Sequence, residues 1–336
     1  MNNGTRAHPL MELRNVSKRF VKPLDAAAKI ANLLGAHQKE EVVHAVDNVS
    51  VAIFPGEVVG LVGESGCGKS TLGRMAVGLH SLSSGKRLWH GQEMDRLSPQ
   101  DRRKAQLRIQ MIFQDPYASL NPRMRVEDIV GEAPVVHGLI DKAHKKEYVE
   151  GLLQRAGLSP TVLRRFPHQF SGGQRARVGI ARALAVQPDF LVCDEAVAAL
   201  DVSIQAQVLN LFMKLRSDLN LTYLFISHDL GVVRHLSDRV VIMYLGRVVE
   251  SASAEELFRR ANHPYTQALL AEAPTLEVKK KEFIAIKGEI PSPLNPPTGC
   301  HFHPRCPNTT ARCRIEAPAQ KEIAPKHFSS CHLNDH

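Results

Sequence analysis

The sequence predicts an α/β fold with a mainly parallel sheet. Two short apolar runs, Phe190–Cys193 and Tyr223–Ile226, are bounded by polar residues, as expected of strands buried on both faces. Stretches with helical periodicity lie between such runs, which is typical of βαβ units. A third apolar run, residues 58–62, is followed by a glycine-rich segment and then by a helical pattern. We therefore expect alternating strands and helices, with several loops at one edge of a sheet.

Composition indicates an ordinary globular chain. The 336 residues allow roughly two domains, and the 43% apolar and 23% charged residues exclude a disordered chain, a collagen and a coiled-coil rod. No apolar run approaches the ~18 residues needed to span a bilayer. The first fifteen residues lack the apolar core of a secretory signal, so we expect a cytoplasmic location.

The net charge of +9 has several readings. It fits nucleic acid, anionic lipid or phosphate ligands, but a solvated surface is the preferred explanation of the net charge alone. The basic residues are spread along the chain and are dense only at 101–104 and 279–282. Aromatic residues make up only 5% of the chain, so platforms for stacking bases are not indicated. We expect no nucleic-acid partner.

The N-terminal third begins with strand patterns. Residues 11–20 have strand character, and residues 21–43 are predicted to be an insertion with a helical middle. Strand character returns over residues 44–62, with a turn at Pro55-Gly56. Residues 100–190 then carry longer helical patterns.

The C-terminal composition is different. Residues 277–282 are charged and predicted to be a linker, and residues 288–336 are rich in Pro, Cys and His. This segment shows little periodicity and is too short to build a core alone. We expect it to need either a staple or docking onto the rest of the chain.

The strongest motif is a phosphate-binding loop, G-x-x-x-x-G-K-S, at residues 63–70. Its glycines let the backbone wrap phosphate oxygens, and its N–H groups with the following helix N-terminus form an anion site. Lys69 is predicted to reach the β- and γ-phosphates, and Ser70 to ligate Mg²⁺. We interpret Cys67 as a small filler rather than an oxidation-sensitive thiol. The expected nucleotide-binding residues here are Gly63, Glu64, Ser65, Gly66, Cys67, Gly68, Lys69, Ser70 and Thr71.

Carboxylates and a histidine follow the two apolar runs named first. Asp194 and Glu195 end one run, and His228 comes shortly after the other. Open α/β sheets bind ligands at the carboxyl ends of their strands. Asp194 is predicted to hold Mg²⁺ through a water, Glu195 to act as general base on the attacking water, and His228 to contact the γ-phosphate. The structural alternative is that these residues cap the helices that follow.

A second glycine-containing motif resembles a known family. Ser171-Gly172-Gly173-Gln174 precedes a helical pattern and is similar to the signature motif of ABC-type ATPases. The resemblance implies that this motif faces the γ-phosphate held by the other subunit of a head-to-tail dimer.

Further marks of that family occur in order. Gln114 resembles the Q-loop glutamine, which implies a role in holding Mg²⁺ together with Ser70 and Asp194. His228 resembles the switch histidine, and Phe20 resembles the aromatic residue that stacks on adenine. Residues 199–201 resemble the D-loop, but residues 196–198 are Ala-Val-Ala instead of Pro-Thr-Ser. Because Lys69, Glu195 and His228 are retained, we still expect these three residues to support ATP hydrolysis.

Within that family the closest resemblance is to the ATP-binding subunits of oligopeptide and dipeptide (peptide/nickel) importers. It is carried by residues 114–124, 167–184 and 199–211 and by two tail segments, 262–270 and 288–307. The resemblance implies two ATPase subunits, with a paralogue as the second, two membrane permease subunits and an external solute-binding protein. The ATPase would lie at the cytoplasmic face of the inner membrane.

Three other functions are weighed against peptide import. One is the same role in an importer of nickel or another small solute. A second is a soluble ABC ATPase acting on ribosomes or DNA, which only the basic charge favours. The third is a regulatory half-site without hydrolysis, suggested by Ala196-Val197-Ala198.

The resemblance also implies the domain plan. We expect an ABC ATPase domain over residues 10–265, made of a P-loop α/β core, an antiparallel β subdomain near residues 11–60 and a helical subdomain over about 115–188. Residues 266–336 are expected to form a peptide-importer extension that ends in a small Cys-rich tail.

Four of the six cysteines lie in that extension, namely Cys300, Cys306, Cys313 and Cys331. Disulfides are not expected in a reducing cytoplasm, and the spacing does not match a zinc knuckle. Four thiols in a segment with little core suggest a [4Fe–4S] cluster or Zn²⁺, with free thiols as the remaining alternative. The resemblance to peptide importers favours the [4Fe–4S] cluster.

Overall fold

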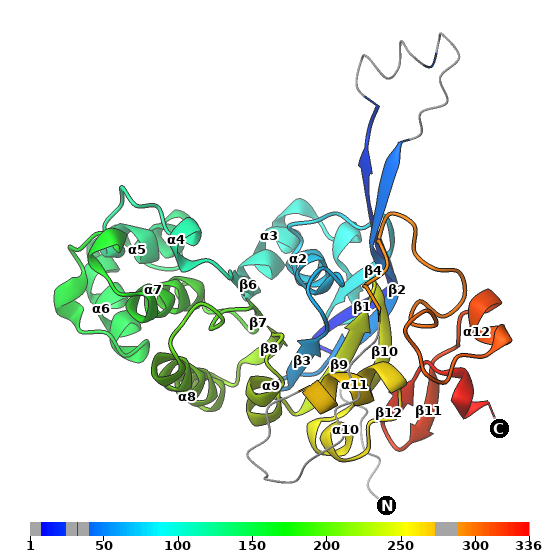
Figure 1. Cartoon of the computed structure of the whole chain (residues 1–336). Helices are drawn as coiled ribbons and strands as arrows, with labels where there is room; N and C mark the ends of the chain where they lie inside the picture. Colours follow the sequence, from blue (N-terminus) through cyan, green and yellow to red (C-terminus); the bar gives the residue numbers. More distant parts are fainter. Residues whose placement is uncertain (1–7, 25–31, 33–39, 273–287, 336) are drawn as a thin grey trace, which may run out of the picture.

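The larger of two sheets forms the centre of the molecule (Figure 1). A computed structural model describes residues 8–24, 32, 40–272 and 288–335. Among these residues the larger sheet has eight strands in the order β11-β12-β10-β9-β3-β8-β7-β6. The five neighbours from β9 to β6 run parallel: β9 (Arg239–Tyr244), β3 (Val58–Val62), β8 (Thr222–Ile226), β7 (Phe190–Asp194) and β6 (Ile109–Ile112).

The parallel strands are the apolar runs predicted from the sequence. Every residue of β3, β7 and β8 is buried, because layers of the fold cover both faces of this part of the sheet. The predicted buried parallel strands at residues 190–193 and 223–226 are therefore confirmed. Strand β6 was not predicted, because its four residues directly follow a helix, without a turn between them.

The smaller sheet is antiparallel and has the order β2-β1-β4-β5. Our expectation of an antiparallel region near residues 11–60 was too short, because the sheet continues to residue 93 while β3 belongs to the larger sheet. The burial patterns distinguish the strands of the two sheets. Strands β1 and β2 of the smaller sheet mix buried and exposed positions, whereas β3 of the larger sheet is buried throughout. Most of the predicted insertion lies outside the described residues. The strands are β1 (Met11–Lys22), β2 (Glu41–Ile53), β4 (Ser84–Trp89) and β5 (Gln92–Glu93).

Helices fall into two groups. One group surrounds the larger sheet: α2 (Lys69–Val77), α3 (Pro99–Arg108), α8 (Val202–Leu219), α9 (Leu230–Leu236), α10 (Ala254–Arg260) and α11 (Pro264–Glu272). The other forms a separate lobe, green in Figure 1: α4 (Pro116–Ser119), α5 (Val126–Val136), α6 (Lys145–Arg155) and α7 (Gly172–Leu184). Short 3₁₀ turns occur at 94–96, 142–144, 160–162, 167–169 and 332–334. The domain boundaries given above remain predictions.

The C-terminal segment docks onto the larger sheet. Strand β10 (Arg247–Ser253) pairs with β12 (His327–Ser329), which pairs with β11 (Lys321–Ala324), and α12 (Ala311–Ile315) precedes them. A small, separate Cys-rich tail with its own staple is therefore not supported. The segment has too few apolar side chains for a core, and it completes the edge of an existing sheet instead.

A buried carboxylate fixes this docking. The side chain of Glu250 on β10 is fully buried and accepts hydrogen bonds from the backbone N–H groups of Asn262 and His263, at 2.7 and 2.9 Å. His327 on β12 places its Nε2 2.7 Å from the same carboxylate. Burial lowers the pKa of His263 to about 3, so its imidazole is neutral and its Nδ1 accepts from the N–H of Tyr265. One carboxylate thus joins three segments.

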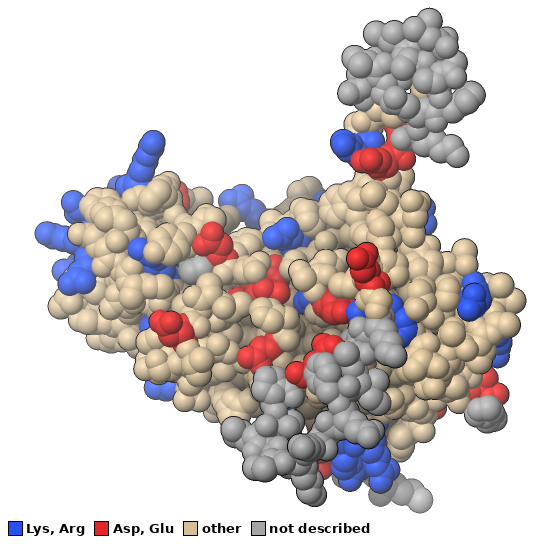
Figure 2. All heavy atoms as spheres, viewed as in Figure 1, with Lys and Arg blue, Asp and Glu red and all other residues tan. Residues whose placement is uncertain are grey.

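Charged side chains are distributed over the surface rather than concentrated. On the face drawn in Figure 2, Lys and Arg side chains gather at the outer end of the helical lobe and recur at separate places elsewhere, with Asp and Glu between them. Among the described residues on this face, the Lys and Arg side chains form no continuous band. Among the described residues, no helix combines the length and apolar character needed to cross a bilayer.

Candidate functional site

The loop at residues 63–70 joins β3 to α2 and is held in a tight curve. Lys69 is buried and its ammonium donates to the carbonyl oxygens of Gly63 and Glu64, at 2.7 and 2.9 Å. The side chain therefore folds back across the loop that contains it. This is the position expected of a lysine that would exchange backbone carbonyls for phosphate oxygens.

Two glycines of the loop are required by the surrounding backbone. Gly68 has φ +103°, and a Cβ there would collide with the carbonyl oxygen of Ala45. A Cβ at Gly63 would collide with the carbonyl oxygen of Met243 on β9. Other side chains would therefore push the loop away from the sheet and open its curve.

Three neighbouring strands bring the other predicted residues to the same edge. Asp194 is the last residue of β7 and Glu195 follows it, Gln114 comes shortly after β6, and His228 comes shortly after β8. Ser70 at the start of α2 donates to the Asp194 carboxylate at 2.7 Å. Burial raises the pKa of Asp194 above its ordinary value, and the hydrogen bond from Ser70 partly offsets this rise.

Both carboxylate oxygens of Glu195 are engaged. Gln114 donates from Nε2 to Oε2 at 2.7 Å, and Nδ1 of His228 lies 3.4 Å from Oε1. The backbone of Glu195 has a φ of +46°, which is uncommon for a residue with a side chain and directs the carboxylate off the end of β7. The structure thus brings Gln114, Glu195 and His228 into one cluster beside Ser70 and Asp194.

The predicted signature motif lies in a different place. Ser171 is the N-cap of α7, where its Oγ accepts from the N–H of Gln174 and the Gln174 side chain accepts in return. Gly172 and Gly173 form the first turn of the helix. This turn belongs to the helical lobe, whereas the loop at 63–70 belongs to the sheet region (Figure 1).

Phe20 and Cys67 are two further residues that the sequence predicts for the nucleotide site, Cys67 from inside the loop. Phe20 on β1 is partly exposed, with His80 edge-on to its ring and the Lys18 ammonium 5.1 Å from the ring centroid. Cys67 is buried, and burial raises the pKa of its thiol, which agrees with a filler rather than a reactive group.

Sequence reasoning missed two residues that contact the loop. Arg305 pairs with the carboxylate of Glu64, and the hydroxyl of Tyr265 accepts from the Glu64 backbone N–H. Both belong to the tail segments that carry the family resemblance, at 262–270 and 288–307. The family resemblance of these segments was the only signal in the sequence that they matter. It does not show where they dock, because Arg305 lies 241 residues from Glu64 in the sequence.

The four tail cysteines line one small cavity, but they do not form a site for a single ion. The cavity measures about 170 Å³ and is also lined by His303 and His332. Among the residues that the structure describes, no group of three or more His, Cys, Asp or Glu side chains converges closely enough to hold a metal ion. The predicted Zn²⁺ or iron–sulfur staple is therefore not supported by such a group. Burial raises the pKa of Cys300 to about 11.

Comparison with known proteins places this site in a family. Residues 46–198 match the model of the ABC transporter family, and residues 249–313 match that of the oligopeptide/dipeptide transporter C-terminal region. The oligopeptide transport ATP-binding protein AppF of Bacillus subtilis is 49% identical over 96% of this chain and 97% of its own. A putative peptide import ATP-binding protein of Brucella ovis is 45% identical over 96% and 97%.

A solved structure agrees with the fold. The ATP-binding cassette MJ0796, in a dimeric post-hydrolysis state bound to ADP and phosphate, has a TM-score of 0.60 and 26% identity over 73% of this chain and 98% of its own. The P-loop fold, the two family models in order and relatives aligned along nearly the whole sequence lead to one conclusion. The chain belongs to the ABC transporter family, as an ATPase of its oligopeptide/dipeptide branch.

Proposed function

We propose that this chain is the ATP-hydrolysing subunit of a membrane importer that takes up peptides. The observation that carries the proposal is the combination of a clustered ATPase site with a C-terminal segment of the oligopeptide/dipeptide type. The relatives reported above are named for peptide transport or import. Import of nickel and action on ribosomes or DNA are not favoured by these findings.

The loop and its neighbours would stabilise charge on the phosphates. Lys69 and the loop N–H groups would bind the β- and γ-phosphates, where negative charge develops during transfer. The oxygen donors of Ser70, Gln114 and Asp194 suit Mg²⁺, which prefers oxygen ligands. When bound, Mg²⁺ would neutralise charge on the phosphate oxygens. The hydrogen bond between Ser70 and Asp194 supports this assignment, because it already brings two of the donors together.

Glu195 would act as the base. A water oxygen attacks the γ-phosphorus, the bond from that phosphorus to the bridging oxygen of ADP breaks, and Glu195 takes the proton of the water. His228 would hold the water and the γ-phosphate. Gln114 and His228 engage both carboxylate oxygens of Glu195, so this carboxylate cannot accept a proton from water. It becomes available when Gln114 leaves it to bind Mg²⁺. ATP binding would thus release the base for water.

The second half of each site would come from another subunit. Ser171, Gly172, Gly173 and Gln174 present a helix N-terminus on a lobe separate from the loop, which suits an anion held by a partner chain. Closure of two such chains around ATP would be followed by opening after hydrolysis. We propose that the partner ATPase is a paralogue and that two permease subunits convert the movement into transport. An external solute-binding protein would deliver the peptide, and the ATPase would lie at the cytoplasmic face of the inner membrane.

The test is ATP hydrolysis and peptide uptake by the assembled transporter in membrane vesicles. Glu195→Gln should lower kcat by about 10²–10⁴-fold, the range for loss of a general base, while ATP binding is retained. The exposed Glu255→Gln serves as the matched control. Hydrolysis by Glu195→Gln at the parental rate would refute the assigned base. Recovery of this chain from solubilised membranes without any permease would refute the importer role.

The cysteine cavity carries a narrower proposal, a [4Fe–4S] cluster. A cluster needs thiolates spaced around several iron atoms, whereas a single ion needs them at one point. The proposal is supported by the four cysteines that line one cavity. Iron and sulfide analysis of anaerobically purified chain should show about four of each. Cys313→Ser should lower both contents, and parental protein without iron would exclude the cluster.

A further inference from the structure

A segment of the extension ends directly on the phosphate loop. The side chain of Arg305 is only 5% exposed, and its two terminal N–H groups donate to the Glu64 carboxylate at 2.7 and 3.0 Å. This pairing is bidentate and shielded from solvent, so salt screens it weakly. Glu64 is the residue after the first glycine of the loop. A charged pair thus joins the loop to a residue next to Cys306.

A second contact holds the backbone of the same residue. The N–H of Glu64 donates to the Tyr265 hydroxyl at 2.9 Å. Tyr265 is fully buried, and its ring packs against Tyr244 and Phe302 at centroid distances of 4.6 and 5.4 Å. Since neighbouring rings fix the tyrosine, the hydroxyl has little freedom. Glu64 is therefore held through its side chain by Arg305 of the extension, and through its backbone by Tyr265, which lies directly before the extension.

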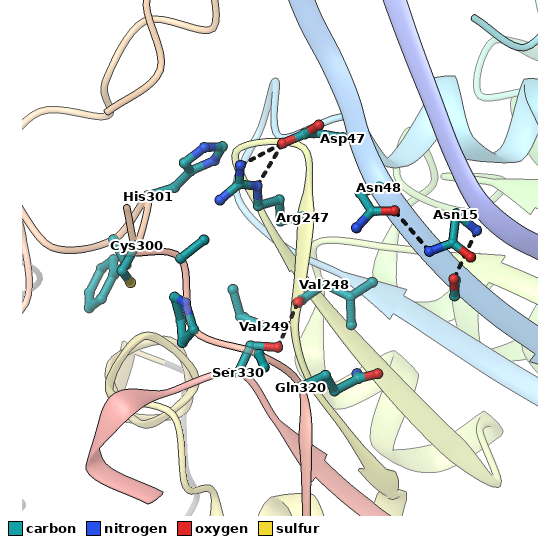
Figure 3. Close-up of a pocket in the computed structure, with 15 residues that line it drawn as sticks. Asn15, Asp47, Asn48, Arg247, Val248, Val249, Cys300, His301, Gln320 and Ser330 are labelled. Atoms are coloured by element: carbon teal, nitrogen blue, oxygen red, sulfur yellow. Dashed lines mark hydrogen bonds and ion pairs between the residues drawn. The ribbon is translucent and has the colours of Figure 1, made fainter. Parts of the chain in front are cut away.

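A third connection runs through the turn between β9 and β10. His301 Nδ1 lies 2.9 Å from the carbonyl oxygen of Leu245, and the N–H of Gly246 donates to the Cys67 carbonyl at 2.9 Å. Arg247 binds Asp47 and the Gly299 carbonyl at the edge of a cavity of about 480 Å³ (Figure 3). The segment that starts at Gly299 is thus seated on the same turn that supports the loop.

The held residue also orients the lysine of the loop. The carbonyl of Glu64 is one of the two that receive the Lys69 ammonium. If Glu64 were released, the loop and Lys69 would sample other arrangements. Only loops in the arrangement that fits phosphate bind the nucleotide. The apparent Kd would therefore rise in inverse proportion to the fraction of molecules in that arrangement.

We propose that Arg305 and Tyr265 are positioning residues for nucleotide binding, through which the tail segments at 262–270 and 288–307 set the shape of the phosphate loop. This inference rests on the proposed role of residues 63–70 as the phosphate site. The loop contacts the phosphates that ATP and ADP share, so loss of either residue weakens binding of both nucleotides.

The test is nucleotide binding by the purified full-length chain, measured by titration calorimetry with ATP and with ADP. Arg305→Gln is expected to raise both Kd values about tenfold, and Arg305→Lys less, because lysine supplies a point charge without the bidentate fork. Kcat at saturating ATP in the assembled transporter should change much less than KM. Arg314→Gln removes an exposed arginine of the same extension and should leave both Kd values at the parental level.

A second variant covers poor folding of the first. Tyr265→Phe removes only the hydroxyl, and should raise both Kd values and speed hydrogen exchange of the Glu64 amide. If Arg305→Gln folds and binds both nucleotides with parental Kd values, the proposal is overturned. If Arg305→Gln does not fold, parental Kd values for both Arg305→Lys and Tyr265→Phe overturn it. Parental chain that binds ATP no better than Lys69→Ala would instead show that the phosphate site itself is wrongly assigned.

Discussion

Replacement of Glu250 by alanine should destabilise the docking of the extension more than any surface change nearby. The carboxylate is fully buried and serves two backbone N–H groups and the His327 ring. Without it, three buried donors lose their acceptor. Each donor that is left without an acceptor costs roughly 1–3 kcal/mol, so the three together should cost several kcal/mol. The total unfolding free energy of a domain is only about 5–15 kcal/mol, so the change should be large.

Urea unfolding of the purified chain, followed by circular dichroism, measures this loss. Hydrogen exchange of residues 321–329 shows whether β11 and β12 open before the rest. Glu250→Gln keeps one acceptor oxygen but turns an amide N–H₂ toward a donor, so we expect an intermediate loss. The exposed Glu255→Ala is the control, with a change within about 0.5 kcal/mol. If Glu250→Ala cost no more than this control, the reasoning from buried donors would be wrong.

Three further perturbations follow from the structure. Gly68→Ala should abolish ATP binding measured by calorimetry while most of the fold remains, because φ +103° and the Ala45 carbonyl leave no room for a Cβ; parental affinity would contradict this. The pKa of His263 is about 3 in the fold and about 6.5 when unfolded, so the unfolded chain binds the extra proton between these values and stability falls as pH drops from 6.5. Between pH 7 and 5 this group should cost about 2 kcal/mol, and His263→Gln should unfold in urea with a flatter pH dependence than the parent. In chain freed of iron by a chelator, the buried thiols Cys67 and Cys193, whose pKa values are raised, should be alkylated far more slowly than the partly exposed Cys313, as peptide mass spectrometry would detect; equal rates would contradict their burial.

The parts of the fold that could be predicted are those written in contiguous residues. The phosphate loop, with its preceding strand and following helix, is complete within residues 58–77, and the strands at 190–194 and 222–226 show their burial as unbroken apolar runs. The residues at the sheet edge could be predicted because parallel strands deliver their ends to one place.

The remaining parts depend on partners far away in sequence. Strands β11 and β12 are four and three residues long, too short for periodicity to reveal them. Arg305 and Glu64 are 241 positions apart, and nothing in the local sequence around either residue predicts that they pair. The contacts of Glu195 with Gln114 and His228 likewise depend on where β7, β6 and β8 end relative to one another along the sheet. The sequence does not specify this register.

The late strands of the larger sheet have a consequence for synthesis. The chain must extend from the end of β10 at Ser253 to His327 before β12 exists to pair with it, and translation at about 5–20 residues per second makes this roughly 4–15 s. During that interval one edge of β10 has unpaired backbone groups beside a carboxylate that still lacks its histidine. An open strand edge invites pairing with other nascent chains. We expect ribosome-bound intermediates that end before residue 327 to be the aggregation-prone species of this protein.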